Sequence, residues 1–232
     1  VTNHEPATGG ADAETNDSMI ERAPRAIRHR GRAVTVEDYE DLARVASPGV
    51  ARARGVPLYD LEADPRATDV RPGVVSLIIV PQSNDAMPLA TTGLLDRVRE
   101  YVDARKSLTA RLVVVGPEYV RVDVAVEAAV TSLEGASDVE LAIAETLARF
   151  LHPLSGGLDG RGWDFGRRPR KSDLYALIEA VDGVDHIRSL TVRGVDRRTG
   201  RVMVEDADYA PAGTLFLVYS GAHVITLSFE EA

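Results

Sequence analysis

Valine occupies every second position from residue 120 to residue 126. Arg121 and Asp123 stand between these valines, and this two-residue period predicts a strand with one buried face and one polar face. Two further apolar runs, residues 74–80 and 111–115, are also strand-sized and rich in valine. Because each such strand must bury its apolar side chains against another element, the chain requires a core of packed sheet and helix.

Four segments have apolar residues three and four positions apart, which predicts amphipathic helices. Thr35, Thr91 or Thr92, and Ser172 can cap three of these helices, and the remaining one starts at Ser137. We also expect a short or broken helix at residues 19–32, where Pro24 lies in the middle, and strands at residues 50–56 and 184–192. A C-terminal hairpin is expected from residues 215–218 and 223–229, with its turn at Ser220-Gly221.

These elements predict an α+β protein of two small units, each a few-stranded, mostly antiparallel or mixed sheet covered by about two helices. The first unit is expected at residues 35–116 and the second at residues 117–232, after an extended arm and short helix at residues 1–34. A repeated plan supports two related units. A capped helix, a Gly-Val step and a strand follow Thr35, and the same succession follows Ser172.

Composition disfavours several classes of function. The chain has 232 residues, a net charge of -9 and no cysteine, so disulfides and cysteine-ligated zinc are excluded and a nonspecific hold on nucleic acid is disfavoured. No apolar run approaches the roughly 18 to 20 residues that cross a bilayer, and residues 1–18 do not resemble a signal peptide. Val1 stands where methionine is expected, which indicates a fragment or an unusual start codon. We expect no nucleic-acid partner and no membrane insertion.

The most unusual segment is the Gly- and Arg-rich stretch of residues 154–171, called the Gly/Arg loop below. It contains Gly156, Gly157, the single tryptophan Trp163, and Phe165. It follows a helix and lacks the glycine spacing of a phosphate-binding loop, so its glycines are expected to shape a loop around the aromatic residues. Trp163 is predicted to be an aromatic anchor in a groove, either of its own chain or of a partner.

Basic residues gather in the second half of the Gly/Arg loop. They are Arg161, Arg167, Arg168, Arg170 and Lys171. Two interpretations remain open, a docking surface for an acidic partner and a solvated loop. The same two interpretations apply to a second basic group, which consists of Arg22, Arg25, Arg28, Arg30 and Arg32.

No residue pattern indicates a reacting centre. The five histidines are scattered, without a pair at the spacing of a zinc site. Ser155 lacks the Gly-x-Ser-x-Gly pattern of a hydrolase. We therefore expect a protein that is not an enzyme and that has no cofactor and no metal.

Several blocks of sequence, in order along the chain, closely resemble the baseplate J family of contractile phage tails and related injection particles. The first blocks are Pro-Ala-Thr-Gly-Gly-Ala-Asp-Ala-Glu at residues 6–14, Arg-Ala-Pro at 22–24, Arg-Ala-Val-Thr-Val-Glu-Asp-Tyr at 32–39 and Ala-Ser-Pro-Gly-Val-Ala-Arg-Ala at 46–53. They are followed by Gly-Val-Val-Ser-Leu-Ile-Ile-Val-Pro at 73–81, by residues 101–111, 115–120 and 150–157, and by Gly-Trp-Asp-Phe-Gly-Arg at 162–167. The resemblance covers nearly the whole chain.

This resemblance implies a structural wedge component of a baseplate, assembled in the cytoplasm as part of a phage-tail-like particle. Its partners would be copies of itself, other wedge subunits, the central hub or spike, and sheath-proximal proteins, with the wedge linking hub to sheath. The family supplies no catalytic residues. Its members carry a further region before the Pro-Ala-x-Gly-Gly block, so this chain resembles their C-terminal portion.

Contact elements and rival functions can also be named. Long irregular segments are expected to meet partners, namely the arm 1–18, the loop 60–72 and the Gly/Arg loop. The main alternative is a small-ligand-binding module of the ferredoxin-like regulatory type, which would need a pocket with converging polar groups between the two units. A glycan hydrolase is a third possibility, which would need two buried carboxylates in a cleft.

Overall fold

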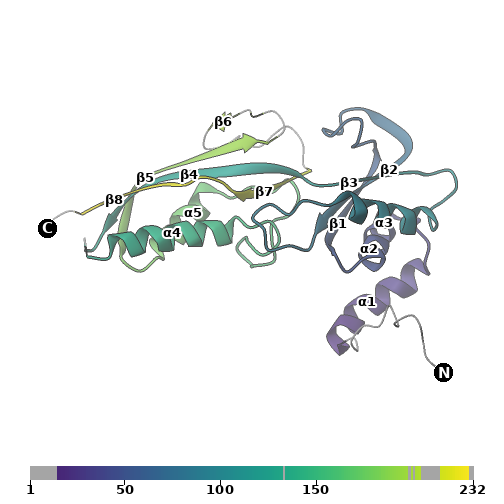
Figure 1. The fold of residues 1–232 in the computed structure, drawn as a ribbon, viewed down its shortest axis with the longest axis horizontal. Coiled ribbons are helices and arrows are strands. Elements are labelled where there is room, and N and C mark those ends of the chain that lie inside the picture. The colour runs from purple at the N-terminus through teal and green to yellow at the C-terminus, as the bar shows by residue number, and fades with distance from the viewer. Residues whose placement is uncertain (1–14, 133, 198–199, 201, 205–214, 230–232) are drawn as a thin grey trace, which may run out of the picture.

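The computed structural model describes residues 15–229 except 133, 198–199, 201 and 205–214. Within these residues the helices are α1 (Asn16–His29), α2 (Val36–Ala46), α3 (Thr92–Asp103), α4 (Ala136–Phe150) and α5 (Lys171–Glu179). The strands are β1 (Val50–Tyr59), β2 (Val70–Pro81), β3 (Arg111–Val115), β4 (Glu118–Val130), β5 (Val184–Asp196), β6 (Val202–Val204), β7 (Phe216–Ser220) and β8 (Val224–Ser228). They form two sheets along an elongated molecule, with helices on one side, so the α+β prediction is confirmed (Figure 1).

The first sheet has the strand order β1-β2-β3. β1 runs antiparallel to β2, with Ala53 opposite Ile79, and β3 runs parallel to β2, with Val114 opposite Leu77. Parallel neighbours need a crossover connection, which α3 provides. α2 and α3 cover one face of this sheet and share its apolar core.

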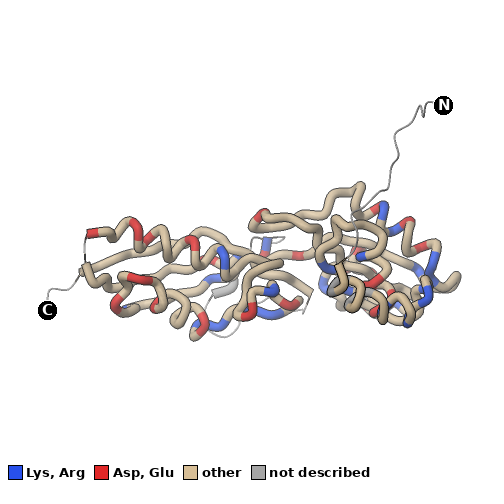
Figure 2. The backbone as a smooth tube through the Cα atoms, turned by 90° about the horizontal axis from the view of Figure 1, so that it is seen from below, with Lys and Arg blue, Asp and Glu red and all other residues tan. Residues whose placement is uncertain are grey.

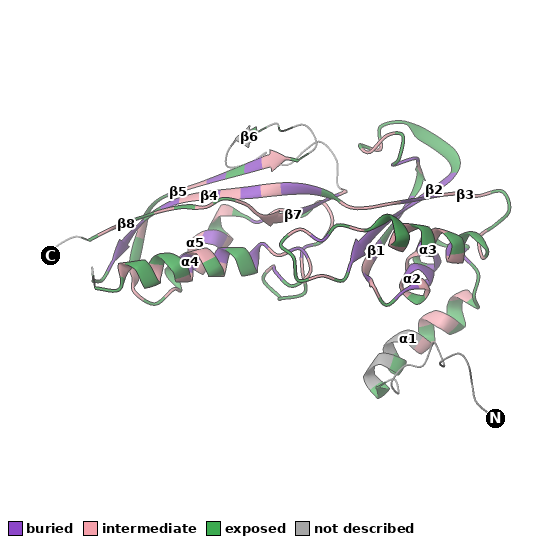
Figure 3. Cartoon of the chain, viewed as in Figure 1, coloured by how far each residue is buried: buried purple, intermediate pink, exposed green. Residues whose placement is uncertain are grey.

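The second sheet has the order β6-β5-β4-β7, and β8 also pairs with β4. β4 and β5 are antiparallel over most of their length, from Val120 opposite Asp196 to Val130 opposite Val184. The alternating valines of β4 pack against α4 and α5, as their period predicts. The buried bands along β4 in Figure 3 follow this alternation.

The predicted C-terminal hairpin is wrong. β7 and β8 each run parallel to β4, with Phe216 opposite Glu118 and Val224 opposite Ala125. They therefore lie one after the other along the same edge of β4. Ser220 is the last residue of β7, and the interruption between the two strands is residues 221–223. β4 is 13 residues long, so its edge can satisfy the backbone groups of both short strands.

Side chains hold this interruption in place. The N–H of Ala222 donates to Asp123 Oδ1 over 3.0 Å. The His223 ring accepts a hydrogen bond from the Val124 N–H through Nδ1 at 3.2 Å, while its Nε2 lies 2.9 Å from Ser220 Oγ. Burial lowers the pKa of His223, although the charge of Asp123 acts to raise it.

Several predicted boundaries change, and three of the changes concern a helix start, a loop and a cap. The helix expected at residues 19–32 is α1, which begins at Asn16 and continues through Pro24. The loop expected at residues 60–72 ends where β2 begins, at Val70. α5 is capped by Arg170 rather than by Ser172, because the Asp173 carboxylate accepts the Arg170 N–H at 3.1 Å.

Replacing His223 with asparagine should make stability less sensitive to acid. The unfolded chain protonates His223 near pH 6.5 and the folded chain only at lower pH, so stability is fully present above this value and falls as the pH drops below it. Asparagine keeps an acceptor for the Val124 N–H but does not titrate. Urea unfolding from pH 8 to pH 5 measures the difference, with His186→Asn, at an exposed histidine, as control. Parallel pH profiles for wild type and His223→Asn would contradict this prediction.

Candidate functional site

The glycines of the Gly/Arg loop allow its backbone to fold tightly over the end of α4. The Gly157 N–H donates to the Phe150 carbonyl at 2.8 Å, and the Gly156 N–H donates to the His152 carbonyl at 2.8 Å. A Cβ at Gly156 would overlap the Phe150 carbonyl oxygen, and Gly157 has a φ of +79°. Both positions therefore require glycine, as the sequence indicates.

Trp163 is enclosed by this fold. Its side chain is 3% exposed, its ring meets Phe150 edge to face at 5.3 Å, and its Nε1–H donates to the Phe150 carbonyl at 2.8 Å. The groove that holds Trp163 is therefore one of its own chain, the first of the two predicted alternatives. Because Trp163 is buried, it has almost no surface for a partner to contact. Its effect on binding would come from the loop conformation that it stabilises.

Phe165 and Arg52 connect the loop to the first sheet. The Arg52 guanidinium donates to the Trp163 carbonyl at 2.6 Å, lies 3.6 Å from the Asp164 carboxylate, and sits 5.6 Å from the centre of the Phe165 ring. Burial lowers the pKa of Arg52, while the charge of Asp164 opposes this effect. The cation of β1 thus joins three successive residues of the Gly/Arg loop, and we call this contact the junction.

Two clusters of apolar side chains pack around Phe165 at the junction. One contains Val56 and Ile78 from the first sheet. The other contains Val80 from the first sheet and Leu217 from the second sheet. These clusters contain side chains from both sheets, so the Gly/Arg loop is packed between the two units.

Two polar contacts reinforce the junction from the β2–α3 connection. The buried Tyr119 hydroxyl donates to the Pro88 carbonyl at 2.7 Å, and burial raises the pKa of Tyr119. His152 Nδ1 accepts from the Ser155 N–H at 3.2 Å, which leaves Nε2 to donate to the Asp85 carbonyl at 3.1 Å. Each contact spans from one unit to the other.

The basic residues of the Gly/Arg loop do not form one cluster around the junction. Arg167 lies 3.8 Å from Asp164, Arg161 and Arg170 are exposed, and Arg168 and Lys171 are partly buried. Arg167 shares the Asp164 carboxylate with Arg52, and a partner surface at these basic residues stays a prediction.

The second basic group is divided in the structure. Arg28 lies 2.7 Å from Asp41, Arg25 lies 3.8 Å from it, and the Asp41 side chain is 8% exposed. These two arginines attach α1 to α2, whereas Arg30 and Arg32 are exposed. The side chain of Arg22 lies outside the described residues.

The predicted contact loop at residues 60–72 is anchored at its start. Asp60 and Leu61 are buried, and Arg111 lies 3.1 Å from the Asp60 carboxylate. The Leu61 N–H donates to Ser76 Oγ at 3.0 Å, which in turn donates to the Tyr59 carbonyl at 2.7 Å. Most of the predicted arm, residues 1–14, lies outside the described residues.

One cavity beside the junction bears on the ligand-binding alternative. This cavity of about 290 Å³ is lined by apolar residues, backbone and one ionisable residue, Glu118. It lacks the converging polar groups that the ligand-binding alternative requires. Across the part of the chain that the structure describes, no three His, Asp or Glu residues are placed to hold a metal ion, and no helix has the length and apolarity to cross a membrane.

No family model matches this chain, and no curated protein matches it. Among solved structures, it is similar to a chain in the cryo-EM structure of the anti-feeding prophage (AFP) baseplate, 6-fold symmetrised. The match has a TM-score of 0.60 and 19% sequence identity over 89% of this chain. The two chains share a fold.

The protein spans 42% of the length of that baseplate chain. At 19% identity the likeness concerns the fold alone. The resemblance of the sequence blocks to the baseplate J family stays a prediction, since no family model matches.

Sequence reasoning missed Arg52. The alternation Val-Ala-Arg-Ala-Arg from residue 50 to residue 54 predicts that Arg52 and Arg54 share one solvent-facing side. Arg52 and Arg54 do lie in continuous register, opposite Val80 and Ile78, but the Gly/Arg loop, 111 residues away in sequence, covers Arg52. No local pattern signals such a contact.

Replacing Gly156 with alanine should destabilise the second unit by about 2 kcal/mol, because the new Cβ overlaps backbone that cannot move without displacing the Trp163 loop. Gly93→Ala is the matched control: no atom lies within 4 Å of its Cβ position, and alanine in a helix should be neutral or stabilising. Urea denaturation followed by Trp163 fluorescence measures both. Equal midpoints for the two variants would show that Gly156 is not constrained.

Replacing Arg52 with alanine should cost about 2 kcal/mol, the contribution of a hydrogen bond to a charged group, and should weaken the coupling of the two units. Arg54→Ala, at an exposed position on the same strand, should have little effect. Hydrogen exchange should show faster opening at residues 163–166 in Arg52→Ala alone. Identical exchange in the two variants would contradict a role for Arg52 in joining the units.

Proposed function

We propose that this chain is a structural component of the baseplate of a contractile, phage-tail-like particle. The observation that carries this proposal is the shared fold with a chain of the anti-feeding prophage baseplate, which covers 89% of this protein. The ordered sequence blocks that resemble the baseplate J family support the same role independently, because they rest on residue identity rather than on shape.

Within the baseplate, the proposed role is that of a wedge subunit between the central hub or spike and the sheath. Its partners would be copies of itself and other wedge proteins, and assembly would take place in the cytoplasm. The junction supports a load-bearing function: Arg52, the Gly/Arg loop and the mixed apolar clusters join two sheets into one elongated body. Such a body can transmit a displacement from one end to the other only if its two parts do not slip.

The proposed role contains no catalytic step. The protein would act through shape and surface, with its irregular segments as connectors. The wedge and linkage assignments rest on the resemblance to the baseplate J family and on the rigidity that the junction implies.

A deletion strain tests this function. Without the gene, we expect the sheath and tube proteins to be made but no sheathed particles to be seen by negative-stain electron microscopy. Wild type supplied in trans should restore particles, Arg54→Ala should restore them equally, and Arg52→Ala should restore fewer. Normal particle numbers in the deletion strain, or purified particles that lack this protein by mass spectrometry, would refute the proposal.

A further inference from the structure

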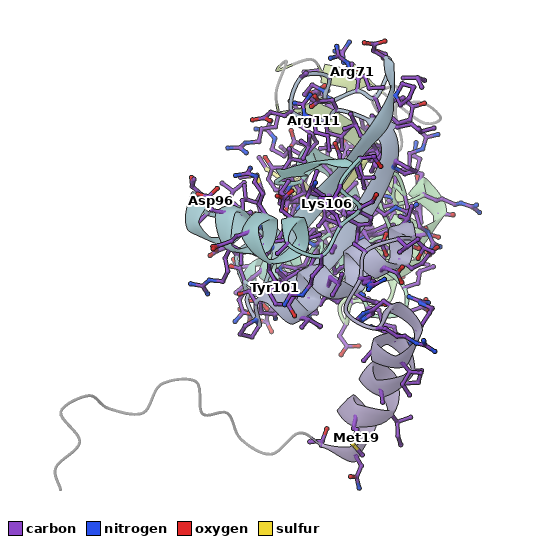
Figure 4. All side chains as sticks on the ribbon, turned by 90° about the vertical axis from the view of Figure 1, so that its right-hand side faces the viewer. Met19, Arg71, Asp96, Tyr101, Lys106 and Arg111 are labelled. Carbon is purple, nitrogen blue, oxygen red and sulfur yellow. The ribbon has the colours of Figure 1, made fainter. Side chains whose placement is uncertain are left out.

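The end of the molecule opposite the second sheet has an open groove of about 950 Å³. Its walls are the connection between α1 and α2 (residues 30–34), the end of β1 (residues 57–58), and the loop between α3 and β3 (residues 104–110). Figure 4 looks onto this end of the molecule, where Lys106 is labelled. The groove is separate from the junction, which lies between the two sheets.

Three aliphatic side chains line this groove and remain exposed. Leu108 is 100% exposed, Val34 is 78% exposed and Leu58 is 47% exposed. Leu58 also has a φ of +68°, which L residues rarely adopt, at a register shift of β1. A strained backbone that presents a leucine to solvent, beside two further exposed aliphatic residues, is typical of a surface that a partner covers.

The rim of the groove is basic. Arg30 and Arg32 are exposed, and neither forms an ion pair with any residue that the structure describes. Lys106 lies 3.4 Å from Asp103, and the Ala33 N–H donates to the Arg105 carbonyl at 3.0 Å, which fixes the two walls to each other. The groove therefore suits an apolar segment that is flanked by carboxylates.

The chain itself carries such a segment, at its other end. Asp138, Leu141 and Glu145 lie along one stripe of α4, spaced by three and four residues, and Leu141 is 59% exposed. No lysine or arginine occurs from residue 122 to residue 148. In Figure 2 acidic residues follow this end of the tube, while basic residues gather at the end with the groove.

We propose that the groove of one copy receives α4 of a second copy. Leu141 would insert between Val34 and Leu108, and the carboxylates of α4 would face Arg30 and Arg32, as in other helix-in-groove contacts. Because the groove and α4 lie at opposite ends of one molecule, the contact is head-to-tail. Repetition of such a contact closes into a ring or extends as a filament.

This inference rests on the assembly role proposed above and names one of its partners, yet its test needs only purified protein.

Leu108→Glu blocks the groove, and Leu141→Arg blocks the α4 stripe. Both positions are solvent-exposed, so each variant should keep the fold, which circular dichroism checks. Leu158→Glu, at a 68% exposed position outside the groove, is the matched control. Sedimentation velocity over a range of concentrations measures association.

Wild type and Leu158→Glu should associate further as concentration rises, and less so at high salt. Each blocked variant should stay at the 25.0 kDa monomer mass, whereas their equimolar mixture should form a dimer and stop there, because one intact groove and one intact stripe remain. A wild type that stays monomeric throughout, or a mixture that stays monomeric, would overturn the inference. Particles could still require the protein, so this failure is distinguishable from failure of the baseplate proposal.

Discussion

The hydrogen bond between the Trp163 indole and the Phe150 carbonyl fixes the part of the chain on which the rest of the structure depends. It buries the single tryptophan and holds the Gly/Arg loop over the end of α4. With the loop in that position, the Trp163 carbonyl faces Arg52. A loop that looks like a surface connection in sequence is therefore the element that joins the two sheets.

The joined units bear directly on the structural role proposed above. A subunit of a contractile assembly must hold its shape under load, and a partly buried cation that meets a carbonyl, a carboxylate and an aromatic face gives directional resistance to slipping. Surfaces for partners can then lie at the two ends, where charge of opposite sign is found (Figure 2).

The repeated helix–strand plan has a counterpart in the structure, but the two units differ in topology. In each unit a helix leads into a strand that runs antiparallel to a central strand, α2 into β1 beside β2 and α5 into β5 beside β4. However, β1 precedes its central strand along the chain, whereas β5 follows it. The short sequence match reflects a common local structure, a helix followed within a few residues by a Gly-Val step into a strand, and does not extend to the order of strands.

Local patterns in the sequence by themselves determined the helices, the buried strands, the glycine-dependent loop and the α+β class, because side-chain period, capping and backbone freedom act over a few residues. They did not determine that β7 and β8 share one edge of β4, or that Arg52 meets a loop 111 residues away. Strand partners and long-range ion contacts depend on which surfaces are left free after the core packs. Only the tertiary structure determines them, because two segments far apart in sequence can stabilise each other only after the fold has brought them together, at a cost in chain entropy.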